Sequence, residues 1–423
     1  MQPKIALDHT VVAEHLQDEV VHVMVELDAP EAPDLERAPL DVVVVLDRSG
    51  SMSGAPIRAV TEATAELLRL AHPNDRIAVV TFDSDADLVL PLASGHGDIG
   101  QGIVRAIRTG GSTNLSGGWL KAFEVLNASP REGALRRIIV LTDGHANAGI
   151  SQGDALAELV GTGRSHTITT SFIGFSDGFD EDLLLTLADA GSGNNYYCEG
   201  ADQAAAVFTA EFNGLASVVA QNISVDVVPT GAVAVVTPLN DFPSTDLPDG
   251  GRQITIGDAY GGEKRRLVLA FNLRPQANHG PLDIAEITLR WTSVVGSVEM
   301  HTVTIPVAIT VGAPGTHDAG ADPRVRDEVI VLQVAKERRQ ARDLANGGEF
   351  DAAANLLDGV AQRLRTVVGR EADADRLVRD AAKLRRREWD AGTSKTYLAQ
   401  SVMYSRDRQT TFLGTEDDDE DDF

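Results

Sequence analysis

The pattern of apolar and polar positions divides the chain into regions of different character. Residues 4–28 contain alternating apolar positions, as in 20–27, which predict strands with one solvated face. From 41 to 217, continuous apolar runs such as 42–46 alternate with amphipathic segments such as 56–70. This repetition predicts an α/β fold, a doubly wound, mostly parallel sheet with helices on both faces.

The other elements of this central region follow from the same two periodicities. Strands are predicted at 76–82, 86–92, 137–142, 166–175 and 195–198, and helices at 98–108, 115–126, 154–162, 181–190 and 202–217. The strand at 86–92 is expected to pair with 76–82 at an edge of the sheet.

Strands without intervening helices dominate residues 218–312. They are predicted at 223–228, 233–236, 253–256, 265–273, 284–291 and 298–311, which favours a β-sandwich. The strands of residues 1–40 lack a core of their own, so we expect them to join this sandwich. Residues 41–217 would then be an insertion between two halves of one β unit.

Helical spacing returns after a Gly- and Pro-rich linker at 313–323. Three helices are predicted in residues 324–390, at 324–345, 351–368 and 373–389. A C-terminal segment, 391–423, follows them. It includes seven consecutive acidic residues, 416–422, which predict a solvated, disordered tail.

Composition narrows the classes of function. The 423 residues are 43% hydrophobic and 24% charged, as in ordinary globular proteins of two or three domains. A formal net charge of −26 argues against nucleic acid or an anionic membrane as the main partner. The lone Cys198 allows no internal disulfide, and residues 1–10 lack the pattern of a signal peptide. No stretch predicts membrane insertion, so a cytoplasmic location is expected.

Candidate chemistry gathers where two buried strands end. Asp47-Arg48-Ser49-Gly50-Ser51 follows the strand 42–46, and Asp143 follows the strand 137–142. A Gly-rich loop containing Thr113 lies between them in sequence. Ligands bind at the carboxyl ends of the strands in such sheets, and hard oxygen donors suit a Mg²⁺-like cation.

These three motifs together resemble the metal-ion-dependent adhesion site of the von Willebrand factor type A family, whose domain has a Rossmann-like fold. The resemblance covers residues 41–217. It implies that the hydroxyls of Ser49, Ser51 and Thr113 bind the cation directly in the open form. It also implies that Asp47 and Asp143 hold the cation largely through water. The expected cation is Mg²⁺, with Mn²⁺ or Ca²⁺ as alternatives in vitro.

Three alternatives stay open at this point. The Asp-x-Ser-x-Ser pattern also fits a helix N-cap ahead of Pro56, in which the side-chain oxygens accept bonds from free N–H groups. Ser112 adjoins Thr113 and offers the same type of oxygen. A site of this kind can also serve stability alone.

The function expected from this reading is metal-dependent protein–protein interaction, with no enzymatic activity. An alternative is an accessory subunit of an AAA+ ATPase or chelatase-like complex, although the chain has no ATPase loop of its own. A Mg²⁺-dependent hydrolase would need a general base beside the metal, and no Gly-x-Ser-x-Gly elbow is present. The overall layout also resembles bacterial and plant proteins that carry this domain before a partner region, and inter-alpha-trypsin inhibitor heavy chains. The residues Ser405-Arg406-Asp407-Arg408-Gln409 fit the former group.

The expected partner is an unidentified protein that offers an exposed Asp or Glu, because hydroxyl ligands leave the cation electrophilic. The tail 416–422 offers such carboxylates within the same molecule or to a neighbouring copy, which would give self-association. Arg385-Arg386-Arg387 would compete for the tail, as would simple solvation.

Overall fold

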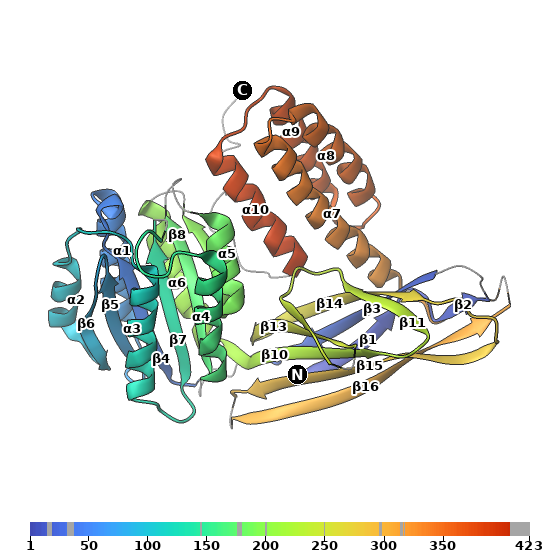
Figure 1. The fold of residues 1–423 in the computed structure, drawn as a ribbon, viewed down its shortest axis with the longest axis horizontal. Coiled ribbons are helices and arrows are strands. Elements are labelled where there is room, and N and C mark those ends of the chain that lie inside the picture. Colours follow the sequence, from blue (N-terminus) through green and yellow to red (C-terminus); the bar gives the residue numbers. More distant parts are fainter. Residues whose placement is uncertain are drawn as a thin grey trace. The chain divides into compact units, whose positions relative to one another are not determined.

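The computed structural model describes residues 1–14, 19–31, 38–143, 146–175, 180–198, 201–248, 250–295, 298–313, 316 and 318–406. The chain forms two compact units. One consists of residues 32–222 with 292–299, and the other of residues 1–31, 223–291 and 300–410. Figure 1 shows the elements of both.

A six-stranded sheet in the order β6-β5-β4-β7-β8-β9 forms the centre of the first unit. Its strands are β4 (Leu40–Asp47), β5 (Arg76–Phe82), β6 (Ala86–Ala93), β7 (Leu135–Thr142), β8 (Ile168–Phe175) and β9 (Ser192–Cys198). All neighbours pair in parallel except the edge strand β6, which is antiparallel to β5. Every residue of β4 and β7 is buried, as continuous apolar runs predict.

Helices cover both faces of this sheet. They are α1 (Ala55–Leu70), α2 (Gly97–Arg105), α3 (Leu115–Ala128), α4 (Gly153–Ser165), α5 (Glu181–Ala190) and α6 (Ala201–Ala216), with a short 3-10 turn at Gly50–Met52. Side chains of α3, α4 and α5 share one core with alternate residues of β4, such as Val43 and Val45. α1 packs beside α6 on the other face. Gly118 lets α3 approach the sheet closely, since a Cβ there would lie 2.7 Å from the Phe82 ring.

The second unit contains two sheets and a bundle of helices. Its sheets have the orders β1-β3-β14-β11 and β12-β13-β10-β15-β16-β2. The strands are β1 (Gln2–Leu7), β2 (Val11–Ala13), β3 (Glu19–Asp28), β10 (Val218–Pro229), β11 (Val233–Pro238), β12 (Ser244–Asp246), β13 (Arg252–Tyr260), β14 (Lys264–Leu273), β15 (Gly280–Ser293) and β16 (Glu299–Gly312). Burial alternates along β10, β15 and β16, so this sheet has one buried and one exposed face, as in a β-sandwich.

The N-terminal strands pair with strands that follow the inserted α/β region. β3 is antiparallel to β14 along its whole length, from Glu19 opposite Leu273 to Asp28 opposite Lys264. β2 is parallel to the last three residues of β16. The α/β fold with its helical C-terminal region is therefore confirmed, and the chain leaves and re-enters the sandwich around residues 32–222.

Within the described residues, four helices follow the sandwich: α7 (Pro323–Asn346), α8 (Phe350–Leu364), α9 (Glu371–Arg385) and α10 (Ala391–Arg406). The sequence pattern predicts no helix at 391–406, and the structure corrects this, because α10 forms there. The segment is rich in Ser and Thr, which are weak helix formers, and it carries little amphipathic periodicity. Its helix instead forms against α7, where Tyr397 and Leu398 are buried. The acidic tail and residues 407–409 lie outside the described residues.

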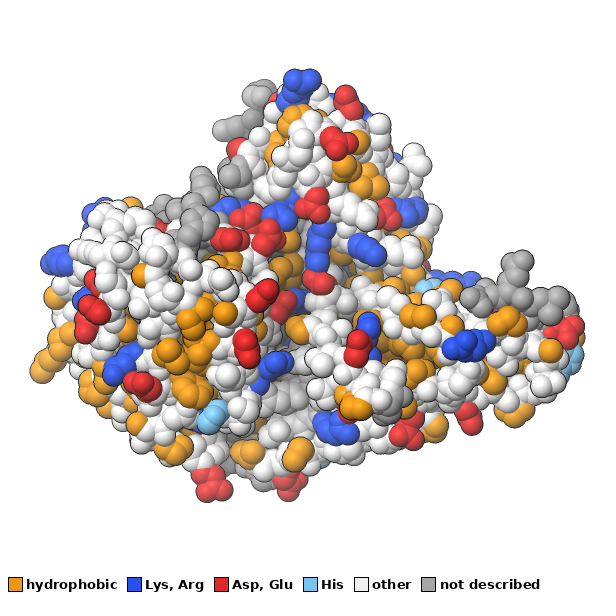
Figure 2. Space-filling view, in the orientation of Figure 1, with side chains coloured by type: hydrophobic (Ala, Val, Ile, Leu, Met, Phe, Trp, Pro, Cys, Tyr) orange, Lys and Arg blue, Asp and Glu red, His pale blue; other side chains and the backbone are white. Residues whose placement is uncertain are grey.

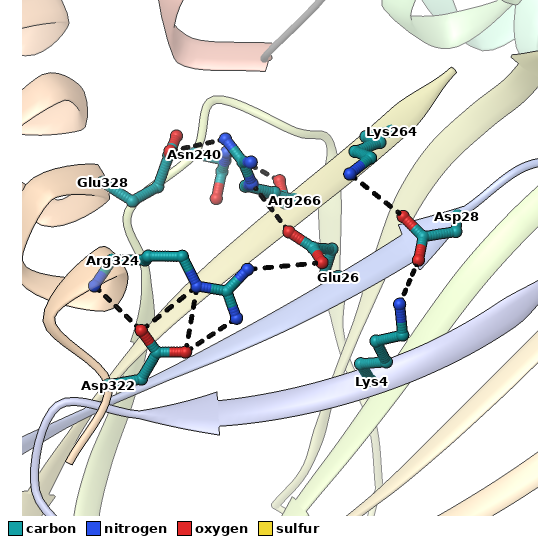
Figure 3. Close-up of polar contacts among 9 residues, drawn as sticks. All are labelled: Lys4, Glu26, Asp28, Asn240, Lys264, Arg266, Asp322, Arg324 and Glu328. Atoms are coloured by element: carbon teal, nitrogen blue, oxygen red, sulfur yellow. Dashed lines mark hydrogen bonds and ion pairs between the residues drawn. The ribbon is translucent and has the colours of Figure 1, made fainter. Parts of the chain in front are cut away.

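A network of ion pairs joins α7 to the sheet of β1, β3 and β14 (Figure 3). Arg266 of β14 binds Glu26 of β3 at 3.1 Å and Glu328 of α7 at 3.2 Å. Asp322 caps α7 by accepting a bond from the Arg324 amide at 2.9 Å. Beside this network, Val325, Val329 and Leu332 of α7 pack on Met24 and Val268.

Candidate metal centre

Asp47 ends β4 with a carboxylate that is fully buried. The Ser49 amide donates to its Oδ1 at 2.8 Å, and the Thr142 hydroxyl donates to its Oδ2 at 2.6 Å. Because Thr142 is the last residue of the neighbouring strand β7, the carboxylate is fixed between two strand ends. Its orientation is therefore set before any ligand arrives.

The hydroxyls of Ser49 and Ser51 and the carboxylate of Asp143 form one chain of oxygens. Ser49 Oγ lies 3.1 Å from Ser51 Oγ, and Ser51 Oγ donates to Asp143 Oδ1 at 2.8 Å. Neither serine caps a helix through its side chain, and the residue before α1 is Gly54. The helix N-cap alternative is therefore wrong for these hydroxyls.

Thr113 belongs to a loop that backbone bonds attach to both of the other site segments. Gly110 N–H donates to the Arg48 carbonyl at 2.8 Å, and the Thr113 carbonyl accepts from the amides of Asn147 and Ala148. The Asn147 side chain accepts from the Thr113 amide at 2.8 Å. Thr113 is buried and its hydroxyl has no hydrogen-bond partner among the described residues, whereas Ser112 is exposed. The two residues thus differ in exposure, and the backbone of Thr113 is the one held against the segment that follows Asp143.

Asp83, in the turn after β5, forms hydrogen bonds with both of these loops. The sequence pattern does not predict this role. Asp83 accepts a bond from the Arg48 guanidinium at 3.0 Å, and its carbonyl accepts from the Asn114 amide at 2.8 Å. The Arg48 guanidinium also binds Asp87 at 2.8 Å. Gly111 has a φ of 70° and lies against Asp83, where a Cβ would come within 2.9 Å of the carboxyl carbon. No local motif marks Asp83, Asp87, Thr142 or Asn147, because their roles depend on tertiary contacts.

Burial shapes the electrostatics of the two carboxylates. Burial raises the pKa of Asp47 above its ordinary value, and the bonds from Thr142 and Ser49 oppose this shift. Burial also raises the pKa of Asp143, with the Ser51 hydroxyl acting in the opposite direction. Two negatively charged carboxylates that are partly removed from water at neighbouring strand ends raise the free energy of the folded protein. A bound cation would offset that cost.

The donor set suits a hard cation that keeps water ligands. Oxygen ligands at about 2.1 Å from an octahedral Mg²⁺ lie about 3.0 Å from their neighbours. The 3.1 Å separation of the Ser49 and Ser51 hydroxyls matches that spacing. Among the described residues no group of three or more His, Cys, Asp and Glu side chains could hold a metal, so the site depends on hydroxyls beside its two carboxylates.

A family model for the von Willebrand factor type A domain matches residues 42–145, which include all five predicted site residues. The chain contains a von Willebrand factor type A domain. The match ends shortly after Asp143, so it covers the strands and loops that build the site rather than the whole α/β unit.

Curated relatives resemble different shares of the chain. The uncharacterized protein sll0103 of Synechocystis is 26% identical over 346 residues, which cover 79% of this chain and 81% of the relative. Inter-alpha-trypsin inhibitor heavy chain H4 of Bos taurus is 31% identical over 128 residues, 28% of this chain and 14% of that protein. The E3 ubiquitin-protein ligase WAV3 of Arabidopsis thaliana is 28% identical over 243 residues, 55% of this chain and 31% of that protein.

A solved structure extends the likeness to the whole fold. The von Willebrand factor type A protein from Catenulispora acidiphila superposes with a TM-score of 0.71 at 16% identity, covering 96% of each chain. The arrangement of type A domain, sandwich and helices is thus a known fold. None of the helices in the described part of the chain combines the length and apolar character needed to cross a membrane.

Proposed function

We propose that this protein binds one divalent cation at the type A domain and uses it to capture an acidic side chain of a protein partner. The observation that carries the proposal is the oxygen chain Ser49 Oγ, Ser51 Oγ and Asp143 Oδ1. Its 3.1 Å step between the two hydroxyls fits adjacent positions of an octahedron, and its 2.8 Å step sets a carboxylate beside them that can hold a metal-bound water. Mg²⁺ is the proposed cation inside a cell, and Mn²⁺ or Ca²⁺ are alternatives in vitro.

Each site residue has a distinct part in the proposal. Ser49, Ser51 and Thr113 would supply neutral oxygens, and Asp47 and Asp143 would supply the negative charge that balances the cation. A cation held largely by neutral oxygens polarises its remaining ligands and favours an anionic one. An Asp or Glu of a partner is such a ligand, and the cation would then become part of the interface.

No enzymatic activity belongs to this proposal. The similarity to the ligase WAV3 spans 31% of that protein, so its named activity does not pass to this chain. A hydrolase would need a general base beside the cation. The carboxylates of the site accept bonds from Ser49, Ser51 and Thr142, and the proposal gives them the role of balancing the charge of the cation. An accessory role beside a separate ATPase is compatible with the same site, and it would use the same acidic contact.

Titration calorimetry with Mg²⁺ and Mn²⁺ tests the cation. Asp47→Asn keeps one acceptor oxygen, which can serve the Ser49 amide, and its NH2 group can donate to the Thr142 hydroxyl, but it removes the charge, and it should weaken binding at least about a hundredfold. Asp75→Asn is the matched control, because Asp75 is a buried aspartate that accepts from the Leu40 amide at the opposite end of β4. Unchanged affinity in Asp47→Asn would refute the assignment.

Capture of partners tests the second half of the proposal. Partners recovered from cell extract should dissociate in EDTA and should be absent from captures with Thr113→Ala, which removes one hydroxyl ligand. Adding Mg²⁺ back should restore them for the unsubstituted protein only. Partners that persist in EDTA and with Thr113→Ala would place the interface away from this site.

A further inference from the structure

The strand β16 has a long edge with no neighbour in the described part of the chain. β15 lies on one side of β16, and on the other side β2 pairs only with Thr310–Gly312. The remainder of the strand, from Glu299 to Ile309, borders the sheet (Figure 1). Free strand edges present unpaired N–H and C=O groups that template pairing with another strand.

The direction of each backbone group on this edge can be derived. The Thr310 amide donates to the Thr10 carbonyl beside β2, so it points away from β15. Exposed and less exposed residues alternate without interruption from Met300 to Val311, which excludes a bulge. Every second residue before Thr310 therefore points its backbone outward in the same way. These are Met300, Thr302, Thr304, Pro306 and Ala308.

Pro306 divides the edge, because it has a carbonyl but no N–H to offer. Its place on the outward side agrees with the general confinement of strand proline to edges. Met300, Thr302 and Thr304 remain as an uninterrupted set of outward donors and acceptors before it. Few charged side chains oppose pairing of this stretch with another strand, because residues 298–312 contain no Lys or Arg and one acidic residue, Glu299. Met300 is 77% exposed.

We propose that this edge binds a second copy of the chain, with the two β16 strands antiparallel and a two-fold axis at Thr302. The outward sets are self-complementary in that register. Met300 would pair with Thr304 of the partner subunit, and Thr302 with Thr302 of the partner subunit, each exchanging two backbone bonds. Cross-strand threonines pair favourably. The two six-stranded sheets become one sheet continuous across the axis.

Charge permits this occupant and sets the conditions of association. Glu299 would lie opposite Ile305 of the partner subunit, so the two acidic residues are about 20 Å apart, beyond the screening length of about 8 Å in physiological salt. The whole chain carries −26, so two copies repel at long range. The dimer should therefore be weak and should strengthen as salt rises. A short paired edge also belongs to the small class of interfaces.

Sedimentation of the full chain, from about 1 to 500 μM in roughly 0.5 M NaCl with EDTA, tests the proposal. EDTA removes any association that depends on the metal site. Thr302→Pro removes the central outward N–H from both copies and should weaken the dimer roughly a hundredfold. Ala308→Pro removes an outward N–H beyond Pro306 and should leave the dimer unchanged. Circular dichroism verifies that both variants fold.

Cross-linking provides a measurement that does not depend on proline. Thr302→Cys should be joined to its symmetry mate by a short bismaleimide, because both thiols lie near the axis. Ala308→Cys is the control, since its two copies would be about 40 Å apart. The native Cys198 is buried and should not react.

Several outcomes would overturn the proposal. The chain can stay monomeric throughout, or Thr302→Pro and Ala308→Pro can have equal effects, or the Ala308→Cys variant can cross-link as well as Thr302→Cys. A monomer that instead binds an extended peptide of alternating apolar residues, sensitive to Thr302→Pro, would assign the edge to a different occupant.

Discussion

At the residue scale, Thr142 fixes the orientation of the predicted metal ligand Asp47, although Thr142 is not itself a predicted ligand. Its hydroxyl is buried and donates to Asp47 at 2.6 Å. Without that donor the carboxylate would lose a bond that favours its charged form and its fixed orientation. The residue therefore acts by positioning a ligand.

Replacing Thr142 with Val keeps the volume of the side chain and removes the donor. We expect a loss of about 1–2 kcal/mol in the free energy of unfolding and weaker cation binding by about tenfold. Thr142→Ser, which restores the hydroxyl, should recover most of the affinity. Chemical denaturation and titration calorimetry measure the two effects, and equal affinities for Thr142→Val and the unsubstituted protein would contradict the positioning role.

The raised pKa values of Asp47 and Asp143 predict how stability depends on pH. A carboxyl whose pKa is higher in the folded than in the unfolded state binds its proton more tightly when folded. The cation-free protein should therefore be less stable above the folded pKa. It should regain that free energy as pH falls toward the unfolded value of about 3.9.

Asp47→Asn isolates this contribution because it cannot titrate. As pH falls through the folded pKa toward about 4, the cation-free unsubstituted protein should gain stability relative to Asp47→Asn. Stabilisation by added Mg²⁺ should shrink over the same interval, since protons compete with the cation for the carboxylates. Unfolding curves at several pH values with and without Mg²⁺ give both quantities. A difference between the two proteins that stays constant with pH would exclude the effect.

At the scale of elements, α10 completes the helical region. Arg338 of α7 is buried beneath it, with its guanidinium 4.7 Å from the Tyr397 ring and bonded to Gln400. At the end of α10, the Ser405 carbonyl accepts from Asn240, and Arg406 donates to the Asp241 carbonyl. The helix thus covers the buried Arg338 of α7, and its last two residues form hydrogen bonds with Asn240 and Asp241 of the sandwich.

Truncation after Asp390 should therefore expose the apolar side chains of α7 to water and remove the Tyr397 and Gln400 contacts of Arg338. We expect loss of cooperative unfolding in this unit, or a decrease of more than about 3 kcal/mol in its stability. Truncation after Arg406 retains every described contact and is the control. Calorimetry compares the two, and a stable protein ending at Asp390 would show that α10 is dispensable.

Elements differ in how much of them could be predicted from sequence. β4 and β7 were found because runs of five and four buried apolar residues, 42–46 and 138–141, are typical of strands in a parallel sheet, and an aspartate stands at the end of each strand. α10 could not be found, because its helical state depends on burial against α7 rather than on its own residues. At the site, Asp47 and Ser49 stand in a local motif, whereas Asp83 acts through contacts that only the fold creates.

At the scale of the whole molecule, two compact units with separate cores predict two unfolding transitions. A cation at the type A domain should stabilise only the unit that holds Asp47. Its free energy of unfolding should rise by about 2.7 kcal/mol when the free cation is at a hundredfold excess over its dissociation constant. Asp47→Asn should abolish this shift and leave the other transition in place. A single transition that moves as a whole with Mg²⁺ would show that the units unfold together.

The acidic tail supplies a second prediction at this scale. If 416–422 competes for the cation, a chain lacking 416–423 should bind an external acidic peptide more tightly, most clearly at low salt. Arg385 and Arg386 are weak rivals for the tail, since they already pair with Asp358 and Glu388. Lys, Arg, Asp and Glu side chains also intermingle over the helical region (Figure 2). Equal peptide affinities for both chains would assign the tail to solubility.

The pairing of β3 with β14 has a consequence for synthesis on the ribosome. Arg266 follows Glu26 by 240 residues, so β3 leaves the exit tunnel long before its neighbour exists. At about 5–20 residues per second, that interval lasts on the order of ten to fifty seconds. Throughout it, the apolar face of β3, with Val21, Val23 and Val25, lacks its β14 neighbour while the type A domain is being translated. We therefore expect the nascent chain to bind chaperones that recognise extended apolar segments until β14 has been made.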